Sequence, residues 1–320
     1  MSYAYHQQRP RTTHHPSSLD SRPRVSDSSE VSEDAFHRLD VTRKVQFAKD
    51  STSLLGEGSS GRVYKGWYRR SNGQQMPVAV KCLMHTRTSR AKMEERLKRE
   101  LITWKRVSTH DNVSELLGVC ITHGDIPYLV LPFFKFNNFL QYTSRVPEAR
   151  LSLAKDIARG LDHLHGNSVI HGDIKPENIM ISDSGRAQIV DFGVSVIPNI
   201  AGFTTVVNWN ARYSAPELLP IDGSEPPKPT KESDIFSLGI LFLQLFDGRG
   251  DCLPYSHHPL KNYRDPHDIN LILAIHNGDR PRFEYYGFSH QQNRWALIEA
   301  CWAPLPRARP TIVQVRQALV

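Results

Sequence analysis

Apolar and polar residues alternate along the chain with two different periods, one typical of strands and one typical of helices. Residues 62–68 (RVYKGWY) and 77–83 (PVAVKCL) are rich in β-branched and aromatic side chains, a composition that favours strands. The Asn-Gly dipeptide at 72–73 favours the tight turn of a β-hairpin. We therefore expect a hairpin here, with further strands at 115–121 and 128–131.

The helical period dominates the C-terminal part of the chain. After Pro147, a residue that suits the first turn of a helix, apolar residues recur at helical spacing. They are Leu153, Ala154, Ile157, Leu161 and Leu164. Helices are also predicted at 91–107, 231–247, 268–276, 292–301 and 311–320. A strand-rich part thus precedes a helix-rich part, and no internal repeat is present.

Residues 1–45 differ from the rest in composition. They are rich in Ser, His, Pro and Arg and show no sustained apolar period. Such a segment cannot bury enough apolar surface to offset the entropy lost on ordering, so we expect a disordered tail. The remaining residues, 46–320, are numerous enough to bury a substantial core.

Charge and cysteine content narrow the classes of partner and compartment. The formal net charge is +7, and much of it lies between Lys81 and Arg106. No aromatic or groove-reading motif accompanies these residues, so we interpret them as a solvated helix face and expect no nucleic-acid partner. The four cysteines lie far apart without a Cys-x-x-Cys pair, which argues against a zinc site or a disulfide framework. Reduced thiols indicate a cytoplasmic protein, with the nucleus as the alternative.

No stretch of the sequence is apolar enough to predict a membrane span. The longest apolar run, at 237–246, is far shorter than the roughly 20 residues of a spanning helix.

Three glycines, Gly56, Gly58 and Gly61, lie between two predicted strands. Without a Cβ they allow backbone N–H groups to approach phosphate oxygens, although a flexible hairpin tip would show the same residues. A dinucleotide-binding fingerprint would need a helix to begin here, whereas residues 62–68 have strand character. The segment therefore favours a glycine-rich flap over nucleotide phosphates.

Lys81 ends the apolar strand segment VAVK, where a lysine is either a surface charge or a cation for the α- and β-phosphates. Glu100, on the next predicted helix, is its candidate ion partner. The alternative is that Glu100 is one more charge on a charged helix.

Two further motifs supply groups suited to phosphoryl transfer. The segment HGDIKPEN at 171–178 contains Asp173 and Asn178, and IVDFG at 189–193 contains Asp191. Phosphoryl transfer needs positioning and neutralisation of negative charge more than covalent chemistry. Asp173 would orient a substrate hydroxyl and accept its proton, while Asn178 and Asp191 offer hard oxygen ligands that suit Mg²⁺. A turn-forming role is possible for each residue, but it does not explain the spacing of all three.

These motifs occur in the order found in eukaryotic protein kinases, which the chain resembles from about residue 46 onward. Ala-Pro-Glu at 215–217, Asp234 in SDIFSLG and Arg309 in RARPT complete the set. In the family the arginine pairs with the glutamate, here Glu217, and the aspartate holds catalytic-loop backbone groups.

The resemblance implies an α+β, bilobal protein kinase fold. A β-rich N-lobe would span about 46–131, a hinge about 132–138, and a helical C-lobe about 139–320. A hydrophobic stack of the family would consist of Trp104, Leu116, His171 and Phe192. The alternative interpretation is that these four are ordinary core residues, which is compatible with the stack.

The resemblance also implies the site residues. The catalytic ones are Asp173, Lys175, Lys81 and Glu100, and the metal ligands are Asn178 and Asp191. The ATP site would comprise Gly56, Gly58, Gly61, Val63, Ala79, Lys81, Leu131, Pro132, Phe134 and Met180. Leu131 would be the gatekeeper; Pro132 lacks an N–H, but the family needs only its carbonyl, and the N–H donor falls at Phe134. The implied cofactors are ATP and Mg²⁺, with Mn²⁺ as the alternative metal, and the implied partners are protein substrates.

Within the family, the segments LLGVC, LVLPFF and CWAPLPRARPT are similar to the tyrosine-kinase-like group and its fungal branch. Lys175 followed by Pro-Glu-Asn is similar to serine/threonine kinases. We therefore expect Ser/Thr phosphorylation, with dual specificity as the alternative.

Gly172 stands where most protein kinases have an arginine. That arginine draws a phosphorylated activation loop into place through charge-assisted hydrogen bonds. We therefore expect activity to depend little on phosphorylation of Thr204 or Thr205 in the loop at 194–214. We also expect the glycine to cost about 0.5–1 kcal/mol of backbone order, which Asp234 can offset.

Two other classes of function share part of this motif set. Small-molecule phosphotransferases have His-Gly-Asp and a following Asn, but generally lack the Asp-Phe-Gly and Ala-Pro-Glu segments. A non-catalytic pseudokinase scaffold would be favoured if Lys81, Asp173 or Asp191 were missing, and all three are present.

Overall fold

The computed structural model describes most of the chain after the predicted tail. The described residues are 38–58, 61–83, 90–107, 109–121, 126–198, 210–221, 224, 227–247, 253–256, 269–288 and 291–319. The tail residues 1–37, and both Thr204 and Thr205, lie outside them.

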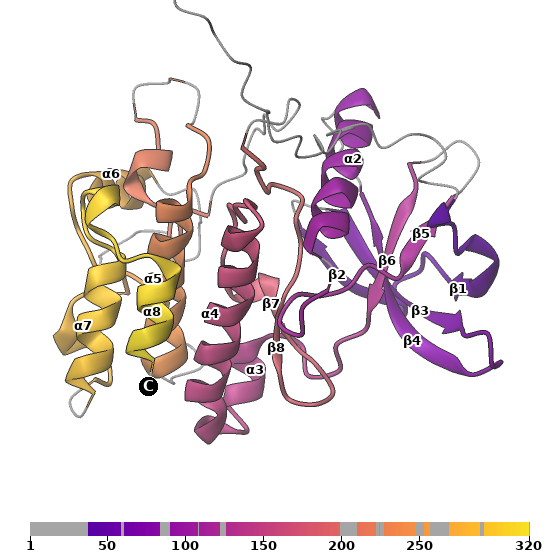
Figure 1. Cartoon of the computed structure of the whole chain (residues 1–320), viewed down its shortest axis with the longest axis horizontal. Helices are drawn as coiled ribbons and strands as arrows, with labels where there is room; N and C mark the ends of the chain where they lie inside the picture. Colours follow the sequence, from indigo (N-terminus) through magenta and orange to yellow (C-terminus); the bar gives the residue numbers. More distant parts are fainter. Residues whose placement is uncertain are drawn as a thin grey trace, which may run out of the picture. The chain divides into compact units, whose positions relative to one another are not determined.

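A six-stranded antiparallel sheet forms the N-terminal part (Figure 1). Its strands are β1 (Val45–Phe47), β2 (Leu54–Gly58), β3 (Gly61–Arg69), β4 (Gln75–Cys82), β5 (Gly118–Cys120) and β6 (Tyr128–Pro132). The strand order is β1-β3-β4-β6-β5, and β2 also pairs with β3. The predicted hairpin is confirmed: β3 pairs with β4, and Gly73 in the turn has φ 82°.

Helix α2 (Arg90–Val107) lies beside this sheet, within one residue of its predicted start (Figure 1). Leu97, Leu101 and Trp104 are buried, as expected of residues three or four positions apart on one helix face.

The C-terminal part is helical, as predicted. Its helices are α3 (Phe139–Thr143), α4 (Arg150–Gly166), α5 (Lys231–Asp247), α6 (Ile269–His276), α7 (Gln292–Cys301) and α8 (Ile312–Ala318). Single 3-10 turns lie at Thr42–Lys44, Pro147–Ala149, Pro176–Asn178, Pro216–Leu218, Phe283–Tyr285 and Pro306–Ala308. A two-stranded hairpin, β7 (Ile179–Ile181) and β8 (Ala187–Ile189), follows the 3-10 turn at Pro176–Asn178.

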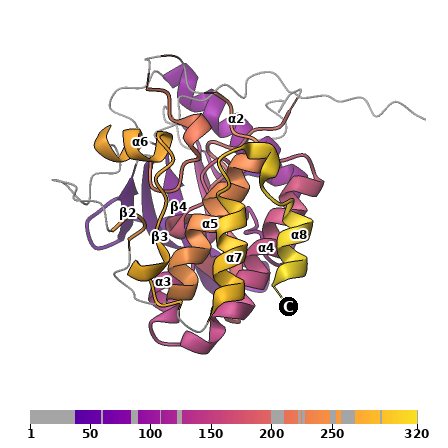
Figure 2. The ribbon, with the colours of Figure 1, turned by 90° about the vertical axis from the view of Figure 1, so that its left-hand side faces the viewer.

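Helix α5 is the centre of the helical part, with α4 and α7 packed beside it (Figure 2). Every residue from Ser233 to Phe246 is buried. An almost uniformly apolar helix is stable only when other elements enclose it, which explains this position. No helix in the described part of the chain is both long and apolar enough to cross a membrane.

The sheet includes residues that the sequence pattern assigns to the tail. Val41 N donates to Val119 O at 2.9 Å, and Val119 N donates to Leu39 O at 2.8 Å. Val41 is buried, and β1 pairs with β3 further along the same sheet. Residues 39–41 and Val45 therefore belong to the sheet, with the 3-10 turn at Thr42–Lys44 between them; a short bridge followed by a three-residue strand leaves no period from which to predict them.

Replacing Gly118 with alanine tests the attachment of residues 39–41. Gly118 has φ 152°, and an added Cβ would lie 2.6 Å from Leu39 O and 2.7 Å from a Val41 methyl group. Because such a backbone conformation is nearly restricted to glycine, we expect G118A to lower the free energy of unfolding by about 1–3 kcal/mol. Urea unfolding measures the loss, and hydrogen exchange should accelerate at the amide of Val41.

Gly166→Ala is the matched control. Gly166 is the last residue of α4, and a Cβ there would point into open space. This variant should unfold at an unchanged or higher urea concentration, so equal losses in the two variants would contradict the assignment of residues 39–41 to the sheet.

Candidate active site

Lys81 on β4 forms ion pairs with two carboxylates. Its Nζ lies 3.0 Å from Glu100 Oε1 on α2 and 2.7 Å from Asp191 Oδ1 in the segment after β8. Lys81 and Glu100 are both buried. The structure therefore joins three elements that are far apart in the sequence through one ammonium group.

The cluster favours the charged forms of Lys81 and Asp191, whereas burial outweighs the effect of Lys81 at Glu100 and raises the pKa of Glu100. Burial lowers the pKa of Lys81, but Asp191 and then Glu100 outweigh it, so the pKa is raised. Burial raises the pKa of Asp191, but Lys81 and Arg96 outweigh it and hold that pKa well below its usual range. Lys81 is therefore a cation and Asp191 an anion at neutral pH. Asp191 also has φ 66°, an uncommon conformation that aspartate tolerates better than most residues.

Asp173 belongs to a second charged group in the loop before β7. Its Oδ2 lies 2.7 Å from Lys175 Nζ and accepts a hydrogen bond from Asn178 Nδ2 at 2.9 Å. Burial raises the pKa of Asp173, although Lys175 opposes the shift. Val190 N donates to Asn178 O at 3.0 Å, which holds the residue before Asp191 against this loop.

The donors in the two groups suit a divalent cation. Because Asn178 Nδ2 faces Asp173, its amide oxygen is directed away from Asp173. That oxygen and the Asp191 carboxylate are hard donors, and such a cation takes its other ligands from phosphates and water. No cluster of three or more His, Cys, Asp or Glu that could hold a metal occurs among the described residues.

Helix α5 holds the backbone of the loop through one buried carboxylate. Asp234 Oδ2 accepts from His171 N at 2.9 Å, and Oδ1 accepts from Gly172 N at 2.8 Å. His165 Nε2 lies 2.9 Å from the same Oδ2. These bonds fix the backbone directly before Asp173.

The expected backbone cost of Gly172 is outweighed by the conformation that the folded loop requires. Gly172 has φ 77°, where a residue with a side chain is strained by about 1–2 kcal/mol. An added Cβ would also lie 3.0 Å from Pro229 Cγ and 3.2 Å from Val194 O. Glycine is therefore the residue that this backbone favours, and the sequence could not show it because φ is set by the surrounding fold.

An aromatic stack connects α2 to the loop. The ring of Phe192 lies edge-on to Trp104, with centroids 5.1 Å apart, and 5.6 Å from the ring of His171. Leu116 packs at the margin of the same core. The segment after β8 therefore cannot shift without disturbing packing in both parts of the domain.

The residues predicted to contact adenine come from adjacent strands. In the sheet register Val63 pairs with Lys81, and Ala79 pairs with Leu131. Met180 lies on β7, opposite Asn138 in an isolated bridge. Pro132 ends β6, and Phe134 lies two residues beyond it. Their roles in nucleotide binding remain predictions.

The predicted flap consists of β2 and β3, paired with Gly56 opposite Val63 and Gly58 opposite Gly61. Residues 59–60 at its tip lie outside the described residues. At the other end of the domain, Arg309 donates to both carboxylate oxygens of Glu217, at 2.6 and 2.8 Å.

Arg96 is a member of the first charged cluster that sequence reasoning missed. It lies one helical turn before Glu100, with its Nε 3.8 Å from Glu100 Oε1. The spacing of four residues places both on the same helix face and could have revealed the pair.

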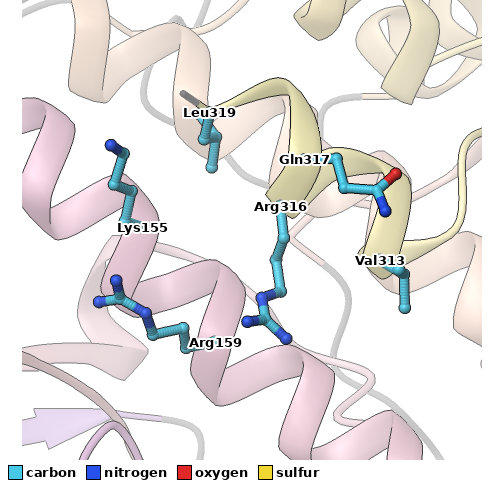
Figure 3. Close-up of a pocket in the computed structure, with 6 residues that line it drawn as sticks. All are labelled: Lys155, Arg159, Val313, Arg316, Gln317 and Leu319. Carbon is cyan, nitrogen blue, oxygen red and sulfur yellow. The ribbon is translucent and has the colours of Figure 1, made fainter.

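A separate hollow of about 390 Å³ lies between α4 and α8 (Figure 3). Its lining residues are Lys155, Arg159, Val313, Arg316, Gln317 and Leu319. Arg159 pairs with Asp156 at 3.0 Å, and Arg316 pairs with Asp162. None of the predicted site residues lines this hollow, so it is distinct from the candidate active site.

Residues 50–319 match the family model described as the protein kinase domain. The chain therefore belongs to the protein kinase family and has its bilobal α+β fold.

Several relatives share this domain. The L-type lectin-domain containing receptor kinase V.9 of Arabidopsis thaliana is 35% identical over 221 residues, which cover 65% of this chain and 31% of that protein. The serine/threonine/tyrosine-protein kinase HT1 of the same organism is 28% identical over 265 residues, which cover 80% of this chain and 62% of that protein. The RGS domain-containing serine/threonine-protein kinase A of Dictyostelium discoideum is 28% identical over 267 residues, which cover 82% of this chain and 21% of that protein. The chain thus spans less than two thirds of each of these relatives.

Replacing Gly172 with alanine tests the backbone requirement at this position. Because φ 77° strains an L-residue, we expect G172A to lower the free energy of unfolding by about 1–2 kcal/mol. The strain falls on the amides that donate to Asp234, so hydrogen exchange should accelerate at the amide of His171.

Gly185→Ala is the matched control, because Gly185 has φ 75° but its Cβ would meet only the hydroxyl end of Tyr142. It should cost similar stability in urea unfolding without changing exchange at His171. A G172A protein as stable as the parent would show that the loop does not require glycine.

Proposed function

We propose that the chain is an ATP-dependent protein kinase that transfers the γ-phosphoryl group of ATP to Ser or Thr hydroxyls of proteins. The observation that carries the proposal is the arrangement of two charged groups around one loop. Lys81 pairs with Glu100 and Asp191, while Asp173 bonds Lys175 and Asn178. Phosphoryl transfer requires such positioned charges of both signs.

Each side chain has a distinct role in this proposal. Lys81, oriented by Glu100, binds the α- and β-phosphates. Asp173 orients the substrate hydroxyl and accepts its proton as the oxygen attacks the γ-phosphorus, and ADP leaves. Lys175, 2.7 Å from Asp173 Oδ2, stabilises negative charge on the transferred group.

Asn178 and Asp191 hold the divalent metal, for which Mg²⁺ fits the donors best and Mn²⁺ is the alternative. When bound, the metal neutralises charge on the phosphates. The remaining nucleotide contacts are those predicted for the flap, for Val63 and Ala79, and for Leu131 to Phe134.

Specificity for Ser and Thr rests on Lys175 and on the names of relatives. The Arabidopsis thaliana proteins serine/threonine-protein kinase 12 and STY17 are named for this activity, at 26% and 25% identity. The name of the relative HT1 includes tyrosine, so dual specificity is the alternative. We also propose that the chain belongs to the tyrosine-kinase-like group, because its segments LLGVC and LVLPFF are similar to that group.

Substituting Asp173 with asparagine tests the proposed activity. With Mg²⁺ and labelled ATP, the full chain should incorporate phosphate into itself or into a general protein substrate. The rate of D173N should be roughly 10²–10⁴-fold lower, because a general base usually contributes a factor of that size. Asp183→Asn is the control, because Asp183 is exposed and forms only a 3.5 Å ion pair with Lys135 in the described structure.

The same assay separates the two other classes of function. No incorporation by the parent, together with no thermal shift on adding Mg-ATP, would favour a pseudokinase scaffold. Phosphate transfer to small alcohols or amines but not to protein would favour a small-molecule phosphotransferase.

Gly172 has no side chain with which to bind a phosphate on the activation loop, so we propose that loop phosphorylation does not control the activity of the kinase. The double substitution Thr204→Ala and Thr205→Ala should therefore leave the phosphorylation rate within about tenfold of the parent, a barrier change of less than about 1.4 kcal/mol. A fall of roughly a hundredfold or more, equivalent to about 2.7 kcal/mol of barrier, would contradict the proposed independence from loop phosphorylation.

A further inference from the structure

The buried cluster around Lys81 has unbalanced charge when Lys81, Glu100 and Asp191 are counted alone. One ammonium group faces two carboxylates, at 3.0 and 2.7 Å. Glu100 is fully buried, and its Oε2 has no hydrogen-bond partner among the described residues. A buried carboxylate with incomplete pairing is strongly unfavourable unless another positive charge lies near it.

Arg96 brings that second positive charge. Its side chain is only 19% exposed, and its Nε lies 3.8 Å from Glu100 Oε1, beyond hydrogen-bond distance. Within the described part of the chain, this buried Nε donates to no partner. The unused donor therefore lies near the carboxylate that carries the unused acceptor Oε2, at 3.8 Å from its other oxygen, Oε1.

Arg96 also reaches the segment that carries Asp191. A Cβ added to Gly193 would overlap the Arg96 guanidinium and Glu100 Oε1, so both groups pack directly against the backbone of Gly193. The positive charge of Arg96 also helps to lower the pKa of Asp191, after the opposing effect of burial and the larger effect of Lys81. One guanidinium thus acts on both carboxylates of the cluster.

An ordinary surface pair on the same helix looks different. Arg90 and Glu94 have the same spacing of four residues and a 2.8 Å contact, but their side chains are 61% and 45% exposed. Such a pair contributes little because water screens it. The burial of Arg96 and its contact with Gly193 distinguish it from a solvated helix charge.

We propose that Arg96 is a positioning residue that balances the charge of Glu100 and Asp191 and holds Glu100 in its ion pair with Lys81 while Lys81 also binds phosphates. The proposal rests on the proposed kinase function. Lys81 cannot give its full charge to both carboxylates and to a nucleotide. Movement of Arg96 Nε by about 1 Å toward Glu100, from 3.8 Å to hydrogen-bond distance, gives that carboxylate a second partner.

Charge substitution at Arg96 gives a readout that a merely structural role would not produce. In Arg96→Gln the cluster carries one more net negative charge, so Mn²⁺ should bind the nucleotide-free full chain roughly five- to tenfold more tightly, measured by electron paramagnetic resonance. Damage to the position of Asp191 would instead weaken Mn²⁺ binding. Lys98→Gln is the matched control, because Lys98 is exposed on the same helix, and it should leave Mn²⁺ affinity within about twofold of the parent.

Kinetics with Mg-ATP provide the second readout. We expect R96Q to lower kcat roughly tenfold or more with a smaller change in KM for ATP, because Glu100 needs the second positive charge most when Lys81 also binds phosphates. Arg96→Lys keeps the charge, so it should bind Mn²⁺ like the parent and recover part of kcat. Arg96→Met, which retains the apolar stem, is the second neutral variant and should behave like R96Q.

The outcomes separate this proposal from the proposed function. Mn²⁺ affinity that is unchanged or weaker in both neutral variants would overturn the role of Arg96, whether or not the chain is active. Tighter Mn²⁺ binding by the neutral variants of a chain without kinase activity would support the role of Arg96 and overturn the proposed function instead. Folding of R96K when neither neutral variant folds would support the need for a positive charge at this position.

Discussion

The ion pairs of Lys81 with Glu100 and Asp191 are the constraint on which the arrangement of the site depends. They join a sheet strand, helix α2 and the segment after β8. Removing one member of a buried ion pair leaves an uncompensated charge and typically costs about 3–5 kcal/mol, so the cluster favours one placement of α2 over others. Phe192 follows Asp191 directly and packs between Trp104 and His171. Electrostatic and packing requirements therefore select the same position of this segment.

A second constraint comes from the core of the helical part. Asp234 lies on the buried helix α5, and its two oxygens accept hydrogen bonds from the amides of His171 and Gly172. A buried carboxylate that accepts several hydrogen bonds is well satisfied and difficult to displace. The catalytic-loop backbone is thus attached to the most enclosed helix of the fold, while Asp173 and Lys175 next to it remain partly accessible.

Local sequence patterns were sufficient for the elements with a clear period. The β3–β4 hairpin and helix α5 lie where the sequence predicts them, because buried and exposed positions alternate along much of β3 while almost all of α5 is buried. Residues 39–45 were not predictable, since they supply only a short bridge and the start of a three-residue strand, and their partners lie far away in the sequence. The sequence predicts the pair of Lys81 with Glu100, and it predicts Asp191 as a metal ligand, whereas the ion pair of Lys81 with Asp191 is visible only in the structure. The spacing of four residues allows Arg96 to pair with Glu100, but a basic residue on a basic helix gives no local signal of burial, so Arg96 was missed.

Gly172 shows why a loop motif cannot be interpreted from its side chains alone. An arginine at this position would contribute in two ways, through its backbone amide and through its guanidinium. The hydrogen bond from the Gly172 amide to Asp234 is kept, at 2.8 Å, and a φ of 77° suits glycine better than any residue with a Cβ. Only the contribution of the guanidinium is lost, and its partner in the family is a phosphorylated loop rather than the substrate. The geometry of the catalytic loop and its response to loop phosphorylation are therefore physically separable, since one depends on the backbone and the other on a side chain.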